Sequence, residues 1–190
     1  NDKGHIFATQ DDLYSTLGEG VVENALRGIS STTFVYGPKG TGKTYSMFGD
    51  MNNEGENAAG MGLLPRVYAE IVDKIQESHS QDTKCQLSML EIYNEKVVDL
   101  LMFTHKDYDP HERRKDHTKV LKIREPPILG PYADGMRKVT VTSKSQVLSI
   151  VNEVLERRKA DEGWMPRRDY KARRTHATLL CTLEITPDVF

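Results

Sequence analysis

Residues Gly37 to Thr44 combine the types and the spacing that bind phosphate groups. They read GPKGTGKT and match the pattern G-x-x-x-x-G-K-[ST] in full. Glycines have no Cβ, so successive backbone N–H groups can turn inward around phosphate oxygens. Lys43 is placed to reach the β- and γ-phosphates, and the Thr44 hydroxyl is placed to bind Mg²⁺. The predicted nucleotide-binding residues of this loop are Gly37, Pro38, Lys39, Gly40, Thr41, Gly42, Lys43 and Thr44.

The alternative to a phosphate loop is a glycine-rich turn that contains Lys-Thr by chance. The flanking sequence argues against that alternative, because a phosphate loop connects a strand to a helix. Thr32–Tyr36, TTFVY, is a short β-branched and aromatic run that predicts a buried strand. Lys43–Phe48 is compatible with the start of a helix. We therefore expect a nucleotide at the carboxyl end of the 32–36 strand, although the loop does not identify the base.

Elements on both sides of the loop are predicted from periodicity and turn residues. A helix is expected to begin after Thr9, to end at Gly28 and to bury the apolar residues Leu13, Leu17, Val21 and Leu26. A second helix is expected with Pro65 at its first position and with Val67, Ile71 and Ile75 on one face. Ser143 and Gln146 form a capping-box pattern before a third helix, whose apolar face is Val147, Ile150, Val151, Val154 and Leu155.

Strands are predicted between these helices, so the expected class is α/β with a mixed or mostly parallel central sheet flanked by helices. Residues 84–101 contain two strand-like runs with a tight turn at Asn94 and Glu95. Val139 and Val141 alternate with threonines, and residues 177–185 alternate like a strand with one buried face. Residues 102–119 are highly charged and lack periodicity, which is typical of an insertion loop.

Composition limits the classes of protein to which the chain can belong. A length of 190 residues favours one domain, and 28% charged residues with a net charge of -2 indicate neither a nucleic-acid binder nor an acidic tail. No apolar run approaches the roughly 20 residues that span a bilayer, and the first residues do not resemble a secretory signal. Two cysteines, Cys85 and Cys181, do not make a disulfide framework, and the six histidines lack metal-ligand spacing. We expect an intracellular protein without membrane insertion.

Beyond the loop, the chain resembles kinesin motor domains over about 180 residues. The likeness is strongest to the vesicle-transporting branch that carries a forkhead-associated domain. The segments that carry it, in order, are QDDLY, VVENALRG, FVYGPKGTGKTYSMFG, GLLPRVYAEI, LSMLEIYNEKVVDLL and LKIREPPILGPYADGMRKVTVTS. An unrelated phosphate-loop enzyme, such as a small-molecule kinase, would not be expected to share the segments outside the loop.

The resemblance implies a phosphate-loop NTPase fold of the kinesin type that covers 1–190 and is incomplete at both ends. It implies an ATP- and Mg²⁺-dependent motor that acts on microtubules in the cytoplasm, with cargo or dimer contacts made by regions outside this chain. It places Tyr45 where the family stacks a side chain on adenine, which a flat ring can do. It also places Ile128 to Met136 near tubulin.

The family's first switch segment, Asn-x-x-Ser-Ser-Arg-Ser-His, corresponds to Asp169–His176 here. Arg174 matches the family's arginine, and Thr175 keeps a hydroxyl where the family has serine. The resemblance implies a catalytic role for both residues. Ala172 and Arg173 replace the Ser-Ser pair, which removes two oxygen ligands for Mg²⁺ and adds a permanent cation. Two interpretations stay open: an impaired hydrolysis step in a non-motor kinesin-like module, or a simple solvated basic loop in this region.

Two other family segments have no counterpart in the sequence. These are the opening strand with Arg-x-Arg-Pro and the second switch, Asp-x-x-Gly-x-Glu. The second switch senses the γ-phosphate in this family, so a complete motor cycle needs it. We therefore expect the chain to be either part of a longer product or a decayed relative of the family.

Overall fold

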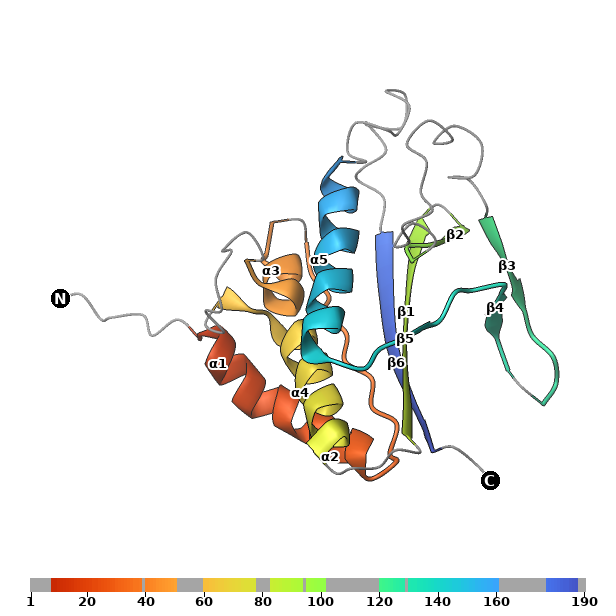
Figure 1. Ribbon diagram of the computed structural model, residues 1–190. Coiled ribbons are helices and arrows are strands. Elements are labelled where there is room, and N and C mark those ends of the chain that lie inside the picture. Colours follow the sequence, from red (N-terminus) through yellow and green to blue (C-terminus); the bar gives the residue numbers. More distant parts are fainter. Residues whose placement is uncertain are drawn as a thin grey trace. The chain divides into compact units, whose positions relative to one another are not determined.

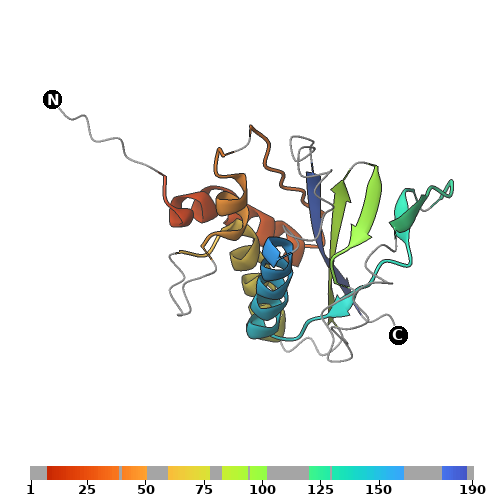
Figure 2. The same cartoon turned by 90° about the horizontal axis from the view of Figure 1, so that it is seen from above.

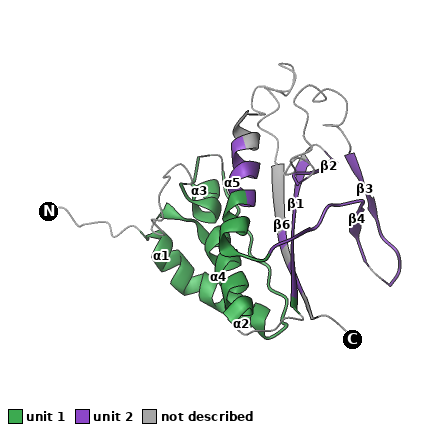
Figure 3. Cartoon of the chain, viewed as in Figure 1, with its two compact units in different colours: residues 1–83, 142–149, 187–190 green, residues 84–141, 150–186 purple. Residues whose placement is uncertain are grey.

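The computed structural model describes residues 8–38, 40–50, 60–77, 83–93, 95–101, 120–128, 130–160 and 177–187. Backbone contacts divide the chain into two compact units, coloured separately in Figure 3. Unit 1 comprises residues 1–83, 142–149 and 187–190, and unit 2 comprises residues 84–141 and 150–186. The expectation of a single domain over 1–190 stays a prediction.

Helices make up unit 1. Its elements are α1 (Gln10–Leu13), the π-helix η1 (Tyr14–Gly18), α2 (Glu19–Leu26), α3 (Lys43–Phe48), α4 (Leu63–Glu77) and the first residues of α5 (Lys144–Ala160). Figure 1 shows α1, η1 and α2 as one continuous helical stretch in red and orange. The stretch begins where predicted, because Thr9 caps it: the Asp12 N–H donates to Oγ1 of Thr9 at 3.1 Å, and Asp12 Oδ2 accepts from the Thr9 N–H at 2.8 Å.

The buried face of this first helical stretch differs from the prediction. Val22 is buried, whereas Leu17 is 47% exposed and Leu26 is equally exposed. The cause is η1, because a π-turn holds one more residue than an α-turn and shifts the phase of the side chains that follow it. The prediction is therefore wrong for Leu17 and Leu26, whereas Leu13 and Val21 on the predicted face are half-buried.

Helix α4 supplies most of the core of unit 1. It contacts α2, α3 and η1, and it buries Leu63, Leu64, Val67, Ala69, Ile71 and Val72. Val67 and Ile71 were on the predicted apolar face, and Ile75 on that face is half-buried. The helix begins at Leu63, two residues before the predicted start at Pro65, so Pro65 lies within the first turn, where a missing N–H costs no hydrogen bond.

Strands make up most of unit 2. They are β1 (Thr83–Tyr93), β2 (Lys96–Asp99), β3 (Val120–Arg124), β4 (Tyr132–Asp134), β5 (Val139–Thr140) and β6 (Ala177–Pro187). The order is β4-β3-β2-β1-β5, and β6 also pairs with β1. Figure 2 shows β1 and β2 side by side in green, followed by β3 and β4 in teal.

The registered strand pairs, β1–β2, β1–β5, β2–β3 and β3–β4, are all antiparallel. The α/β class is confirmed, but parallel pairing is absent from these four pairs. Short connections account for the β1–β2 and β3–β4 pairs, because a turn of a few residues can join antiparallel strands only. The β1–β2 turn is the predicted one: Glu95 has a φ of 63°, and Asn94 lies outside the described residues.

The predicted strand at Thr32–Tyr36 is wrong. Residues 32–36 adopt no regular structure and all five are exposed, with Phe34 83% and Tyr36 88% exposed. A short apolar run becomes a strand only when neighbouring strands accept and donate its backbone hydrogen bonds. No described strand pairs with these residues.

Helix α5 matches its prediction. The Gln146 N–H donates to Oγ of Ser143 at 3.2 Å, and the Gln146 side chain accepts from the Thr142 N–H at 2.9 Å rather than from Ser143. The predicted apolar face is buried: Val147, Ile150, Val151, Val154 and Leu155.

Other predictions fall largely on residues that the structure does not describe. The charged stretch 102–119 lies outside the described residues, as do most side chains of β6. Within the described part of the chain, none of the helices combines the length and the apolar character needed to cross a membrane.

Candidate functional site: the phosphate loop

The phosphate loop has the backbone conformation that its glycines predict. Gly40 has a φ of 85°, and Gly42, the residue before α3, has a φ of 84°. These left-handed conformations strain any residue with a Cβ, which explains why the sequence places glycine at both positions. Open space lies beside both residues where a Cβ would stand. The loop therefore presents backbone that a ligand can approach closely.

Lys43 folds back across this loop. Its Nζ donates to the carbonyl oxygen of Pro38 at 2.5 Å, and Oγ1 of Thr41 donates to the same oxygen at 2.8 Å. The ammonium group is thus held over the loop by an acceptor that a phosphate oxygen could replace. Lys39 lies outside the described residues.

Thr44 and Tyr45 follow in the first turn of α3 and are both exposed. The Tyr45 side chain is 57% exposed, so its ring has a free face on which a planar base could stack. Its backbone carbonyl accepts from Nε2 of Gln10 at 2.7 Å, and this bond joins the beginning of α1 to α3. Together, the described residues of the loop offer a cation, a hydroxyl, an open backbone and a flat ring.

The end of α3 is joined to the beginning of α4 by three glycines. Gly49 forms an antiparallel bridge with Met61, the Asp50 N–H donates to Gly60 O at 2.9 Å, and the Gly62 N–H donates to Phe48 O at 3.1 Å. A Cβ at Gly49 would lie 2.1 Å from Gly60 O, and one at Gly62 would lie 2.4 Å from Gly49 N. Only residues without a side chain allow this approach, so the junction holds α3 firmly.

Arg66 supports the same junction, and sequence reasoning missed it. Its Nε donates to Met61 O at 2.7 Å, and its Nη1 forms an ion pair with Asp11 at 2.5 Å. Arg66 therefore joins the junction to α1, as Gln10 joins α1 to α3. Asp11 lies 55 residues from Arg66, and no local pattern could have paired them.

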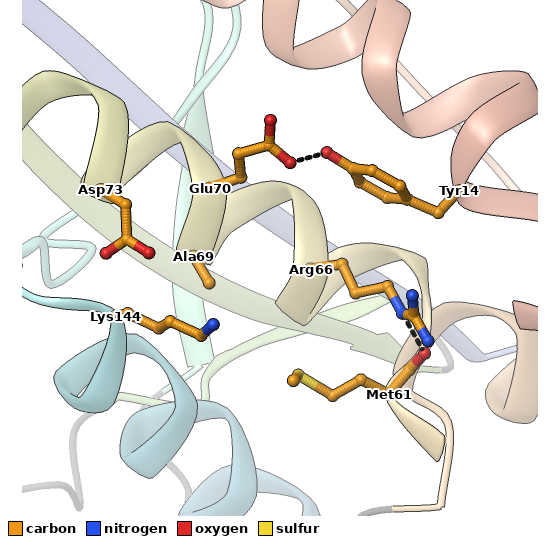
Figure 4. Close-up of a pocket in the computed structure, with 7 residues that line it drawn as sticks. All are labelled: Tyr14, Met61, Arg66, Ala69, Glu70, Asp73 and Lys144. Atoms are coloured by element: carbon orange, nitrogen blue, oxygen red, sulfur yellow. Dashed lines mark hydrogen bonds between the residues drawn. The ribbon is translucent and has the colours of Figure 1, made fainter. Parts of the chain in front are cut away.

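A separate cavity of about 300 Å³ lies in unit 1 (Figure 4). It is lined by Tyr14, Met61, Arg66, Ala69, Glu70, Asp73 and Lys144. The Tyr14 hydroxyl donates to Glu70, which also pairs with Lys74 at 2.9 Å. Burial and the Glu70 bond raise the pKa of Tyr14. Burial opposes ionisation of Glu70, but its bonds to Tyr14 and Lys74 outweigh burial and lower its pKa. Tyr14 and Glu70 are thus held by each other, and no residue of the phosphate loop lines the cavity.

In unit 2, the described residues among 128–136 run from the connection between β3 and β4, through β4, to the segment that follows it. Ile128 is 99% exposed, and Arg124 forms an ion pair with Asp134 at 2.6 Å across the hairpin. That pair raises the pKa of Arg124. The hairpin thus carries an apolar residue at its tip and a charged pair lower down.

The sequence profile of the kinesin motor domain matches residues 4–189. This chain belongs to the kinesin motor domain family. The match covers both units, so the phosphate loop and the hairpin lie within one family domain.

Individual kinesins support the assignment. Kinesin-like protein KIF13B of Homo sapiens is 35% identical over 95% of this chain, and kinesin-like protein KIF13A of Mus musculus is 38% identical over 77%. Kinesin-like protein unc-104 of Caenorhabditis elegans is 33% identical over 77%. The chain spans only 9%, 8% and 8% of the lengths of these three relatives.

The kinesin fold is also seen in a solved structure, that of a fast kinesin. It superposes with a TM-score of 0.71 over 95% of this chain and 46% of its own, at 24% identity. The likeness shows the fold. Within this kinesin chain, Asp169–His176, which include Ala172, Arg173, Arg174 and Thr175, lie outside the described residues, so their predicted roles stay predictions.

Proposed function

We propose that this kinesin chain binds ATP with Mg²⁺ at residues 37–45 and belongs to a motor that couples ATP hydrolysis to action on microtubules in the cytoskeleton. The observation that carries the proposal is the phosphate loop, a complete G-x-x-x-x-G-K-T motif with Gly40 and Gly42 in left-handed conformations directly before α3. Family membership supports ATP over other nucleotides and microtubules as the partner.

Each described residue of the loop has a separate task in this proposal. The backbone around Gly40 and Gly42 surrounds the phosphates, and Lys43 exchanges the Pro38 carbonyl for β- and γ-phosphate oxygens. Thr44 provides an oxygen ligand for Mg²⁺, which neutralises phosphate charge when bound. Tyr45 stacks on adenine. Gln10 and the glycine junction keep α3, and hence these groups, in place.

Microtubule binding is assigned to residues 128–136 of the hairpin. The sequence of this segment is similar to the part of kinesins near tubulin, and its tip residue Ile128 is fully available for contact.

A second candidate function is a kinesin-like module that binds microtubules or a partner chain but hydrolyses ATP poorly. The observation that favours it is the pair Ala172 and Arg173. Neither side chain offers an oxygen to Mg²⁺, and the guanidinium would be repelled by it. Arg174 and Thr175 remain the proposed catalytic residues of the segment.

Steady-state ATP turnover by the parent motor domain, with and without microtubules, tests the proposal. We expect microtubules to stimulate turnover. ATP binding without stimulation would replace the proposal with the second candidate.

A double variant, Ala172→Ser with Arg173→Ser, measures the effect of the altered switch in the same assay. We expect it to raise turnover while ATP affinity stays constant. Unchanged turnover would show that these two residues do not limit hydrolysis.

A further inference from the structure

Asp99, the last residue of β2, is a charged group that the phosphate loop does not use. Its side chain is fully buried in unit 2. Oδ1 accepts from the Leu101 N–H at 2.8 Å, and Oδ2 accepts from the Arg137 N–H at 2.6 Å. A buried carboxylate is costly unless hydrogen bonds compensate it, and both oxygens are used here.

The two donors lie on different segments of unit 2. Leu101 lies two residues after Asp99, whereas Arg137 lies 38 residues away in the connection from β4 to β5. Asp99 is therefore a bridge between the sheet and the segment that leaves the β3–β4 hairpin. Buried and hydrogen-bonded to backbone on both oxygens, it fixes that bridge in one geometry.

Contacts therefore fix the hairpin on its β3 side and on its β4 side. On the β3 side, Val97 and Val98 of β2 pair with Leu121 and Val120. On the β4 side, β3 is the one strand partner of β4 among the described residues, and the segment just after β4 is bound by Asp99. Leu121 and Ala133 share a small buried cluster with Leu90 and Val97, against which Met136 packs.

We propose that Asp99 is a positioning residue for microtubule binding: through the Arg137 N–H it fixes the direction in which the hairpin and its tip residue Ile128 project. The inference rests on the proposed function, because it concerns the hairpin assigned to tubulin. Without the bridge, the hairpin would pivot on the β2–β3 pairs, and its contact residues would have to be ordered again upon binding.

Two substitutions of Arg137 distinguish the effect of its backbone N–H, which binds Asp99, from the effect of its side-chain charge. Arg137→Ala and Arg137→Pro both remove the guanidinium, but only proline removes the N–H that binds Asp99. Asp99→Asn is a third variant, because an amide offers one oxygen and must direct its NH₂ group at a backbone N–H. Ser88→Ala, at another buried polar residue of unit 2, controls for general loss of stability.

The measurements are co-sedimentation with microtubules, ATP affinity and amide hydrogen exchange at Arg137, with the chain in its parent motor domain. We expect Arg137→Pro and Asp99→Asn to weaken microtubule affinity about tenfold relative to Arg137→Ala and Ser88→Ala. ATP affinity should stay within about twofold in all four. In the wild type and in Ser88→Ala, the Arg137 amide should exchange slowly, and Asp99→Asn should accelerate it.

Equal microtubule affinity of Arg137→Pro and Arg137→Ala would overturn the inference and leave the proposed function intact. The comparison does not depend on Asp99→Asn, so it stands if that variant fails to fold. A wild-type protein that binds ATP but does not co-sediment with microtubules would overturn the microtubule part of the proposed function and, with it, this inference.

Discussion

Two runs that were predicted as strands differ in their structure: one forms a strand and the other does not. Thr32–Tyr36 and β1 are both rich in β-branched, aromatic or aliphatic residues, and each was predicted as a strand. In β1, Leu87 and Met89 are fully buried, and the strand pairs with β2, β5 and β6. In Thr32–Tyr36 all five residues are exposed and pair with no described strand.

The difference shows that strand formation here depends on neighbours more than on propensity. The end of β1 pairs with β2 across a turn of two residues, and the rest of the strand pairs with β5 and β6. Thr32–Tyr36 is followed at once by the phosphate loop, whose glycines bend the chain and supply no adjacent strand. Strand propensity measures how well side chains fit a paired, half-buried surface, and such a surface must first exist.

The largest expected effect comes from the buried run. Leu87→Ala should lower the free energy of unfolding by about 3–4 kcal/mol, because it deletes a fully buried side chain and leaves a cavity. Urea denaturation followed by circular dichroism measures the loss. A loss below about 1 kcal/mol would mean that β1 is not packed as described.

In backbone pairing, Gly49 is intermediate between the paired strand β1 and the run 32–36, because it pairs with Met61 through one isolated bridge. Gly49→Ala places a Cβ 2.1 Å from Gly60 O at a φ of 78°, so we expect a loss of about 2 kcal/mol or more from backbone strain. Gly20→Ala, where a Cβ would meet nothing within 4 Å, is the matched control. Equal stabilities of the two variants would contradict the close approach at the junction.

The rate at which the Cys85 thiol is alkylated measures how well β1 is buried. Burial raises the pKa of its thiol to about 11, and the thiolate is the reactive form. Alkylation of Cys85 at pH 8, followed by peptide mass spectrometry, should be at least tenfold slower in the folded protein than in urea. Burial disfavours the thiolate, so the stability that Cys85 contributes should fall as the pH rises from about 8.5, the unfolded value, towards 11. Rapid alkylation of the folded protein at pH 8 would contradict the burial of this residue.

The exposed run should give the smallest effect. Phe34→Ser should change the free energy of unfolding by less than about 0.5 kcal/mol, because the side chain is 83% exposed. The same denaturation experiment applies. A loss above 2 kcal/mol would show that residues 32–36 are packed like a strand and would remove the contrast with β1.

Sequence patterns within a few residues predicted the helix caps, the turn and the glycine conformations, because interactions between neighbouring residues determine these features. Gly40 and Gly42, the Thr9 cap, the Glu95 turn and the Ser143–Gln146 cap each involve residues within a few positions of one another. The π-turn at η1 was missed, because nothing in a 3.6-residue pattern marks an extra residue.

Contacts between distant residues were not predictable in the same way. The Gln10–Tyr45 bond joins residues 35 positions apart, and the Asp99–Arg137 bond joins residues 38 apart. Periodicity carries no information about such pairs. The motif therefore located the candidate nucleotide site, while the groups that position it became visible only in three dimensions.

Titration of MgATP against the wild-type chain and its Lys43→Ala variant tests the central claim, that residues 37–45 form a nucleotide site. Isothermal calorimetry should show saturable, one-to-one binding by the wild type. The variant should bind at least about tenfold more weakly, because the ammonium group that faces the phosphates is gone. Equal affinities of the two proteins, or no binding by the wild type, would contradict the claim.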